Sequence, residues 1–258
     1  MDILVLALLA TSATGFMTAV GALPILFKRR PSEALNDTLL GFSAGVMLAA
    51  AFFSLIIPAL EISEQQHGEG MIPAFIAVVG ILAGAFCMAI IERVVPHRHF
   101  NTGMEGVKPE RIRAIWLFVF AMAIHNFPEG LAVGVSFGGP DPADGYPLAI
   151  GIGLQNIPEG LAVALGLLAV GYSRAKAFWV AAATGLLEPL GGLVGGLFVQ
   201  LSGALLPWGL VFSAGAMLFV ISHELIPETH RHGHHRRATS GLMVGLVTMM
   251  FLDVWLAG

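Results

Sequence analysis

The chain has 258 residues, of which 56% are hydrophobic and only 12% are charged, and its formal net charge is −4. Because soluble domains carry about 25% charged residues, this composition excludes a soluble globular domain and a disordered chain. The single cysteine, Cys87, also excludes an intrachain disulfide framework or a thiolate metal cluster. The composition therefore predicts a protein that spans a lipid bilayer.

Eight stretches of the chain are long and apolar enough to cross a bilayer, which takes about 20 helical residues. They run approximately over residues 3–27, 36–60, 71–94, 114–138, 146–170, 175–201, 206–228 and 239–257. The first stretch lacks the basic segment of a signal peptide, so we expect it to remain as a helix. The sequence thus predicts an all-α polytopic membrane protein with one domain, residues 1–258.

Basic residues occur only in every second loop. All 13 Lys and Arg residues fall in the first, third, fifth and seventh loops, and the loops between them contain none. Lys and Arg are retained on the cytoplasmic side of a membrane. We therefore expect both termini to lie outside the cytoplasm, with a loop at 95–113 and a His-rich loop at 229–238 inside it.

Two segments recur on spans that cross in opposite directions. Residues 125–133 on span four match residues 155–163 on span five at seven of nine positions, including an Asn-x-Pro-Glu-Gly core. Residues 42–48 on span two resemble residues 212–218 on span seven, although chance similarity between Gly- and Ala-rich helices would also explain this second match. Inverted repeats are typical of transporters that bind their substrate near the membrane midplane.

Three acidic residues lie deep inside predicted spans, where ionisable side chains are costly and usually functional. They are Glu129, Glu159 and Glu188. His125 precedes Glu129 by four residues and Gln155 precedes Glu159 by four, so each pair projects from one helix face. Asn126 and Asn156 lie one position further round, where Glu188 could join them. Because each Glu could bridge the two groups, the spacing predicts a site with two metal positions.

The polar residues could instead hold helices together, as single Asn and Gln residues often do. Buried carboxylates without a Lys or Arg nearby would, however, be strongly destabilising or would have to be protonated. A divalent cation removes that charge problem. Imidazole, carboxylate and amide ligands without thiolates favour zinc as a transported ion, with cadmium, ferrous iron or manganese as alternatives.

Helix-breaking and small residues flank the acidic positions. Pro128 and Pro158 each remove a backbone donor, so we expect a kink and a freed carbonyl beside the ligands. Gly130 and Gly160 follow Glu129 and Glu159, and we expect them to permit close contact between helices.

A second group of metal-binding residue types lies at the cytoplasmic end of span seven and beyond it. The group consists of His223, Glu224, His230, His232, His234 and His235. Neutral imidazoles there could take a metal ion on its way out or sense it, whereas a solvated basic loop is the alternative. His97 and His99 have the same two interpretations. Met47 could offer a thioether to the central site or simply pack, and the pattern assigns no role to Glu92 or Asp253.

These motifs resemble those of the ZIP (Zrt/Irt-like) metal transporters. The resemblance is carried by His-Asn-x-Pro-Glu-Gly at 125–130, by x-Asn-x-Pro-Glu-Gly at 155–160 and by Glu-Pro at 188–189, and it extends over all eight spans. Bacterial GufA-type members are the most similar, through Met-Leu-Ala-Ala at 47–50, Ser54, and Ser-His-Glu-Leu-Ile-Pro-Glu-Thr-His at 222–230.

The resemblance implies uptake of zinc and related divalent cations into the cytoplasm through a binuclear site by alternating access. It assigns one position to His125, Glu129, Gln155 and Glu159, and the other to Asn126, Glu129, Asn156, Glu159 and Glu188. It implies that spans one, four, five and six move against a scaffold of spans two, three, seven and eight, within a homodimer. It places Met47 and Ser54 on the access route, and His223, Glu224 and the loop histidines on the exit.

Two residues depart from the family pattern. Many relatives have His where this chain has Gln155, and GufA-type members have Asp where it has Asn156. We expect these changes to alter the affinity of the second position and the metal preference.

Two other function classes fit part of the pattern. An intramembrane metal-dependent hydrolase would use Glu129 or Glu159 to activate a metal-bound water, and a metal sensor would use the loop histidines. The duplicated Pro-Glu-Gly motif favours transport, so we expect a transporter rather than an enzyme. The sequence lacks a Gly-x-x-x-x-Gly-Lys-Ser/Thr motif, so we expect an ion gradient to supply the energy, and we expect no nucleic-acid partner.

Overall fold

The computed structural model describes residues 2–27, 31–94, 109–139 and 141–256, and the regular structure within these ranges is helical throughout. Eight helical runs there are long and apolar enough to cross a membrane, which confirms the predicted all-α polytopic fold. The runs are Ile3–Phe27, Glu33–His67, Met71–Arg93, Glu110–Ser136, Pro142–Ala169, Arg174–Leu201, Gly203–His230 and His235–Leu256.

Several spans combine more than one helical segment. The segments are α1 (Ile3–Ala22) and η1 (Leu23–Phe27); α2 (Glu33–Ala50), η2 (Ala51–Ile56) and α3 (Ile57–His67); α4 (Met71–Val94); α5 (Pro109–Ser136); η3 (Pro142–Asp144) and α6 (Gly145–Ala169); α7 (Arg174–Thr184) and α8 (Leu187–Leu201); η4 (Gly203–Leu205), α9 (Leu206–Val220), η5 (Ile221–Leu225) and α10 (Ile226–His230); and α11 (His235–Leu256). Side chains of Asp2, Ser32 and Ser173 accept backbone N–H groups at the starts of α1, α2 and α7. Short polar residues favour this capping position, so local sequence sets where these helices begin.

Some predicted boundaries differ from the structure. Span two continues to His67, so Glu61 and Glu64 lie on α3 rather than in a loop. The helix continues beyond the end of the apolar run. It stops at Gly68, because the positive φ of 78° at this glycine lies outside the range of a right-handed helix. The predicted 229–238 loop is shorter because α11 begins at His235. Most of the predicted 95–113 loop lies outside the described residues.

The helix break next to the acidic residues lies in span six. α5 and α6 are continuous through Pro128 and Pro158, so the expected kinks do not interrupt them. Gly185 and Leu186 form a turn between α7 and α8. Glu188 therefore lies in the first turn of α8, where the positive end of the helix dipole favours a carboxylate.

The segments η2 and η5 are single wide helical turns with π-type hydrogen bonding. Each begins nine residues after the first residue of its repeat, Phe42 in span two and Phe212 in span seven. Each is followed by a proline, Pro58 or Pro227, whose ring would clash with a carbonyl one turn earlier, and a wider turn relieves that clash. Because π-type turns are rare, their equivalent positions support a genuine repeat rather than a chance match.

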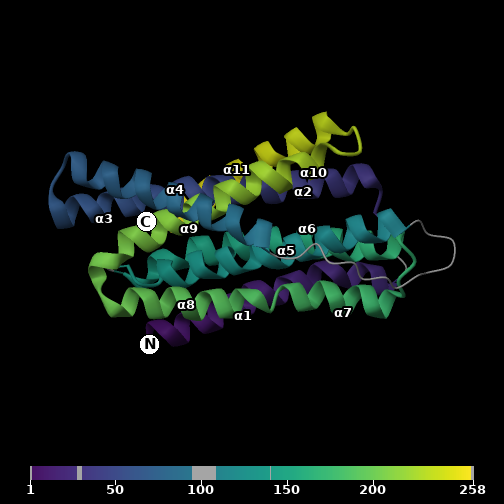
Figure 1. The fold of residues 1–258 in the computed structure, drawn as a ribbon, viewed down its shortest axis with the longest axis horizontal. Coiled ribbons are helices and arrows are strands. Elements are labelled where there is room, and N and C mark those ends of the chain that lie inside the picture. Colours follow the sequence, from purple (N-terminus) through teal and green to yellow (C-terminus); the bar gives the residue numbers. More distant parts are fainter. Residues whose placement is uncertain (1, 28–30, 95–108, 140, 257–258) are drawn as a thin grey trace.

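The helices lie roughly along one long axis and form two connected sets (Figure 1). In one set α1 packs against α6 and α8, and α5 packs against α8; in the other α2 packs against α11, and α4 packs against α9. Contacts of α2 with α6 and of α5 with α9 join the sets. The polar residues discussed below lie on α5, α6 and α8, with hydrogen-bond partners on α1 and α2. The division into a moving unit and a scaffold remains a prediction.

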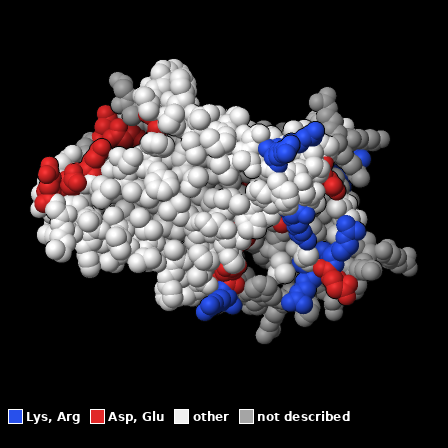
Figure 2. Space-filling view, turned by 90° about the horizontal axis from the view of Figure 1, so that it is seen from above, with Lys and Arg blue, Asp and Glu red and all other residues white. Residues whose placement is uncertain are grey.

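Charged side chains separate along the long axis. In the view of Figure 2, the blue Lys and Arg side chains gather at one end of the molecule, and a cluster of Asp and Glu lies at the other. Both chain ends lie toward the end that carries the turn between α3 and α4 (Figure 1). Which end faces the cytoplasm remains a prediction from the basic residues.

Candidate metal site

Seven polar side chains from α5, α6 and α8 are buried together inside the bundle. They are His125, Asn126, Glu129, Gln155, Asn156, Glu159 and Glu188, and each is at most 2% exposed. The three carboxylates lie close enough for their charges to interact. The packing therefore gathers the predicted residues in the interior instead of turning them toward lipid.

Glycines beside the acidic residues bring the helices that carry them close together. A Cβ added to Gly130 would lie 2.0 Å from the carbonyl oxygen of Glu188, and one added to Gly160 would lie 2.0 Å from that of Thr18. Real Cβ contacts essentially never fall below 3.0 Å. These positions therefore have no room for a side chain, and the close helix contact expected at both glycines is present.

Glu188 is held by groups from two other helices. The Thr14 hydroxyl on α1 donates a hydrogen bond to Glu188 Oε2. Asn156 Nδ2 on α6 donates to Glu188 Oε1 at 2.6 Å and to the Thr14 carbonyl oxygen at 2.8 Å. The carboxylate of α8 is thus positioned against α1 and α6.

Gln155 and Glu159 share a contact with α2. Ser43 Oγ lies 2.6 Å from Gln155 Oε1 and 2.5 Å from Glu159 Oε1. Gln155 Nε2 in turn donates to Asn156 Oδ1 at 2.9 Å. One connected network therefore runs from Ser43 through the α6 side chains to Glu188.

Sequence reasoning did not identify Thr14 and Ser43. Ser43 has a signal, because it belongs to the repeated Phe-Ser-Ala-Gly segment, whose second copy places Ser213 equally buried on α9. Thr14 is only one of several hydroxyl residues in span one, and nothing in the sequence distinguishes it from Thr11 or Thr18.

Glu129 differs from the other two carboxylates. It is 0% exposed, neither of its oxygens has a partner at full hydrogen-bond geometry, and the Gln155 side chain approaches it. Glu159 Oε2 likewise has no partner. Within the described parts of the chain, no Lys or Arg forms an ion pair with either residue, and no three His, Cys, Asp or Glu side chains form a ready-made metal cage. Free carboxylate oxygens can accept a cation, and the neighbouring amides could supply further ligands.

His125 connects the central residues to η5. Its Nε2 lies 3.1 Å from Glu224 Oε1, and its ring is also close enough to Glu159 for their charges to interact. A cavity of about 410 Å³ is lined by Glu224 and, among others, by Glu92, His223, Glu228 and Arg231. The structure thus joins two groups that the sequence analysis treated separately, the central ligands and the residues at the end of span seven.

The predicted exit residues do not form one cluster. His223 Nε2 lies 3.0 Å from Glu92 Oε1, which gives Glu92 a partner. His230 Nδ1 lies 2.9 Å from the Ile226 carbonyl oxygen, and its ring stacks on that of His235. His232 and His234 contact α2 instead. His97 and His99 lie outside the described residues.

The two predicted access-route residues lie on α2 and η2. Met47 is 1% exposed and packs within the hydrophobic core. Ser54 lies on η2, and its Oγ donates to Asp253 Oδ1 on α11 at 2.8 Å. Asp253, which the sequence left without a role, is therefore a partner of Ser54.

Comparison with known proteins gives consistent matches along the chain. A family model described as ZIP zinc transporter matches residues 2–110 and 105–253. The zinc transporter GufA of Myxococcus xanthus is 47% identical over 251 residues, which cover 97% of each chain. The zinc transporter ZIPB of Bordetella bronchiseptica is 46% identical over 93% of this chain and 78% of its own, and human zinc transporter ZIP11 is 32% identical over 97% of each. These names describe transport and not enzymes, so they give the hydrolase alternative no support.

Proposed function

This chain belongs to the family of ZIP zinc transporters, and from that membership and the buried polar residues we propose that it carries zinc through a site between α5, α6 and α8. The names of its relatives support zinc as the transported substrate. The ligand types also suit cadmium, ferrous iron and manganese as competing ions.

The observation that carries the proposal is the environment of Glu129. A fully buried carboxylate that only the Gln155 side chain approaches, next to two further carboxylates, is strongly destabilising if nothing compensates its charge. Each oxygen of a buried carboxylate normally has at least one hydrogen-bond partner, and a divalent cation can take that place while neutralising two negative charges. Zinc binding therefore removes the penalty that the protein alone leaves at this position.

The network suggests how two metal positions would share ligands. We place one ion among His125, Glu129, Gln155 and Glu159, and the other among Asn126, Glu129, Asn156, Glu159 and Glu188. Glu129 and Glu159 bridge the two because both have oxygens free of hydrogen bonds. Thr14 and Ser43 position Glu188 and Glu159 from α1 and α2.

We propose that zinc leaves toward the basic end of the molecule, which we place in the cytoplasm of a bacterial inner membrane. The cavity lined by Glu224 supports this direction, since three carboxylates and His223 line it against a single basic residue, Arg231. Met47, Ser54 and Asp253 would serve the opposite, access side. Alternating access would then require the set containing α1, α5, α6 and α8 to move against the set containing α2, α4, α9 and α11, within a homodimer.

Substitution of the unpaired acids tests the site. We expect Glu129→Ala or Glu159→Ala to abolish uptake of labelled zinc into proteoliposomes, because each change removes a bridging ligand. Glu64→Ala is the matched control, since Glu64 is exposed on α3, and it should transport normally. Full uptake by a correctly folded Glu129→Ala protein would overturn the site assignment.

A further inference from the structure

An apolar groove lies between α1 and α6, toward the end of the molecule where the chain begins (Figure 1). Its volume is about 580 Å³, and none of its described lining residues is charged. Large side chains that line it, among them Leu9, Tyr146 and Ile150, are exposed. Small residues such as Ala10 and Gly153 also line the groove and leave the space between the two helices. The groove is therefore an apolar hollow on the surface of two membrane-spanning helices.

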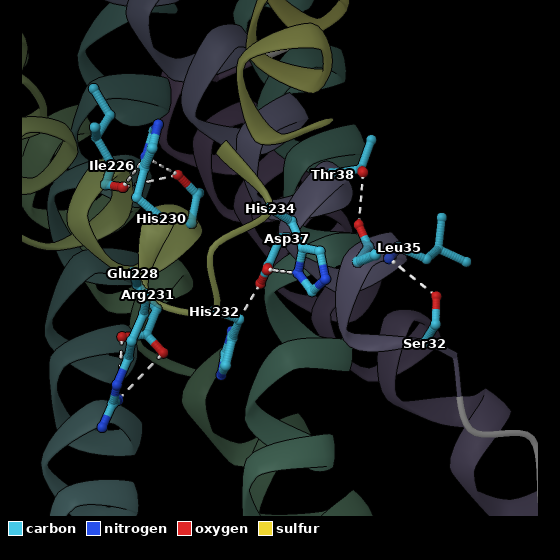
Figure 3. A network of polar contacts seen from close by, with 12 residues as sticks. Ser32, Leu35, Asp37, Thr38, Ile226, Glu228, His230, Arg231, His232 and His234 are labelled. Atoms are coloured by element: carbon cyan, nitrogen blue, oxygen red, sulfur yellow. Dashed lines mark hydrogen bonds and ion pairs between the residues drawn. The ribbon is translucent and has the colours of Figure 1, made fainter. Parts of the chain in front are cut away.

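The chemistry of this groove differs from that of the cavities at the basic end. Glu228 and Arg231 line both of those cavities and form the ion pair drawn in Figure 3. The described lining of the groove has only two polar side chains, Thr14 and Tyr146, and the Thr14 hydroxyl already donates to Glu188. Because an ordered water needs two to four polar partners, the groove favours hydrocarbon over water.

The length of the groove matches one leaflet of a bilayer. Along α1 it extends from Leu6 to Met17, which is a rise of about 16 Å at 1.5 Å per residue. The hydrocarbon core of a bilayer is about 30 Å thick, so the groove covers about half of it. The groove starts within the first turn of α1, which begins at Ile3. A lipid chain from the leaflet at this end therefore fits its length, whereas a spanning helix would extend well beyond it.

The charged residues that flank the groove in the sequence are acidic. Asp2 caps the start of α1, and Asp144 lies two residues before Tyr146; both are exposed. The sequence contains no Lys or Arg in residues 1–27 or 114–173. Asp144 also forms no ion pair within the described parts of the chain. A headgroup with a positively charged amine is attracted to such a surface, and an anionic headgroup is repelled.

We propose that the α1–α6 groove binds an acyl chain of phosphatidylethanolamine from the leaflet at the acidic end. The chain gains dispersion contacts in space that the small residues leave unfilled, and the amine of the headgroup lies near Asp144. Thr14 both lines the groove and donates to Glu188, so the bound chain packs against a residue that positions a carboxylate of the transport site. Lipid binding is independent of the transport proposal, whereas an effect of the lipid on zinc uptake rests on it.

Photolabelling of the full-length protein tests where the lipid binds. The protein is reconstituted in bilayers of phosphatidylethanolamine and phosphatidylglycerol with a trace of phosphatidylethanolamine that carries a diazirine on its acyl chain, and labelled peptides are identified by mass spectrometry. We expect the labels to concentrate in residues 6–17 and 146–154, rather than on the exposed faces of α4 and α11.

A side chain that fills the groove should remove these labels. A Cβ added at Gly153 would meet the side chains of Met17 and Thr14 at 3.6 and 3.8 Å, which are ordinary contacts, so the ring of Gly153→Phe can enter the groove. Ala83→Phe is the matched control, because Ala83 is exposed on α4 and receives the same ring outside the groove. Ala13→Phe fills the groove from α1 and serves as a second variant if Gly153→Phe does not fold.

The headgroup is tested with phosphatidylglycerol that carries the same diazirine. We expect it to label the groove less than phosphatidylethanolamine does, and we expect Asp144→Asn to reduce that difference. Equal labelling of the groove by the two lipids in the unchanged protein would overturn the assignment of an amine headgroup.

The remaining outcomes separate this proposal from the transport proposal. Equal labelling of the groove in Gly153→Phe and Ala83→Phe would overturn the binding site, and so would labels spread evenly over α1, α4, α6 and α11. Equal zinc uptake by these two variants would overturn the link to Glu188. Failure of the transport proposal would instead appear as full zinc uptake by Glu159→Ala, a variant in which the groove should still be labelled.

Discussion

The contact between Gly130 and Glu188 offers a sensitive test of how α5 positions the carboxylate of α8. In Gly130→Ala the new Cβ would lie 2.0 Å from the Glu188 carbonyl oxygen, so the two backbones must separate by at least about 1 Å to reach the 3.0 Å lower limit. Overpacking of this kind costs about 1–3 kcal/mol. A displacement of about 1 Å is large compared with the range of zinc–oxygen distances, and misplacement on this scale can reduce function about 100-fold.

The expected result is a loss of zinc uptake that exceeds the loss of stability. We expect Gly130→Ala to reduce the initial rate of uptake into proteoliposomes about 100-fold while the protein stays monodisperse in detergent. Gly153→Ala on α6 is the control, because its added Cβ would lie 3.6 Å from the nearest side-chain atom, an ordinary contact. If both alanine variants transported at the same rate, close packing of α5 on α8 would not be what positions Glu188.

Two further predictions concern the polar network. Ser43→Ala removes a hydroxyl that contacts Glu159, and because hydrogen bonds to charged groups contribute about 1.5–3 kcal/mol, the efficiency of zinc uptake should fall by about tenfold or more. The control is Ser213→Ala, whose hydroxyl has no partner and whose uptake should stay within about twofold of the unchanged protein. Equal effects of the two changes would argue against a specific role for Ser43. Asn156→Asp replaces a donor to Glu188 with a second acid. In chelator the variant should therefore unfold at a lower temperature than the unchanged protein, and zinc should raise its unfolding temperature by a larger amount. A smaller zinc-induced rise would contradict a ligand role for position 156.

The membrane-spanning helices and the burial of the central residues were both predictable from sequence. Composition and the lengths of the apolar runs indicated eight spans, and the described part of the chain contains eight helical runs of sufficient length. Glu129, Glu159 and Glu188 stood out because acids inside apolar helices need a functional or structural reason. Spacing of four residues placed His125 with Glu129 and Gln155 with Glu159 on shared helix faces, which the burial of all four agrees with.

Breaks and wide turns within the helices were harder to predict from sequence, because they depend on hydrogen bonding between successive turns. The prolines predicted kinks in α5 and α6, which are continuous helices, and the break in span six lies at Gly185 and Leu186. The wide turns η2 and η5 each lie just before a proline. The sequence repeat did not predict these turns, and their equivalent positions in the two copies were found only in the structure.

Sequence by itself determined which segments are apolar enough to enter the membrane and which polar side chains carry a high free-energy cost when buried in it. Both depend only on composition and on spacing within one helix. Only the tertiary structure decided the partners: Thr14 with Glu188, Ser43 with Glu159, Glu224 with His125, and Asp37 with His232 and His234. These pairs lie on different helices, most of them far apart in the chain, so their contact depends on how helices cross. Glycine contacts with facing backbones set those crossings, and no pattern within a single helix encodes them.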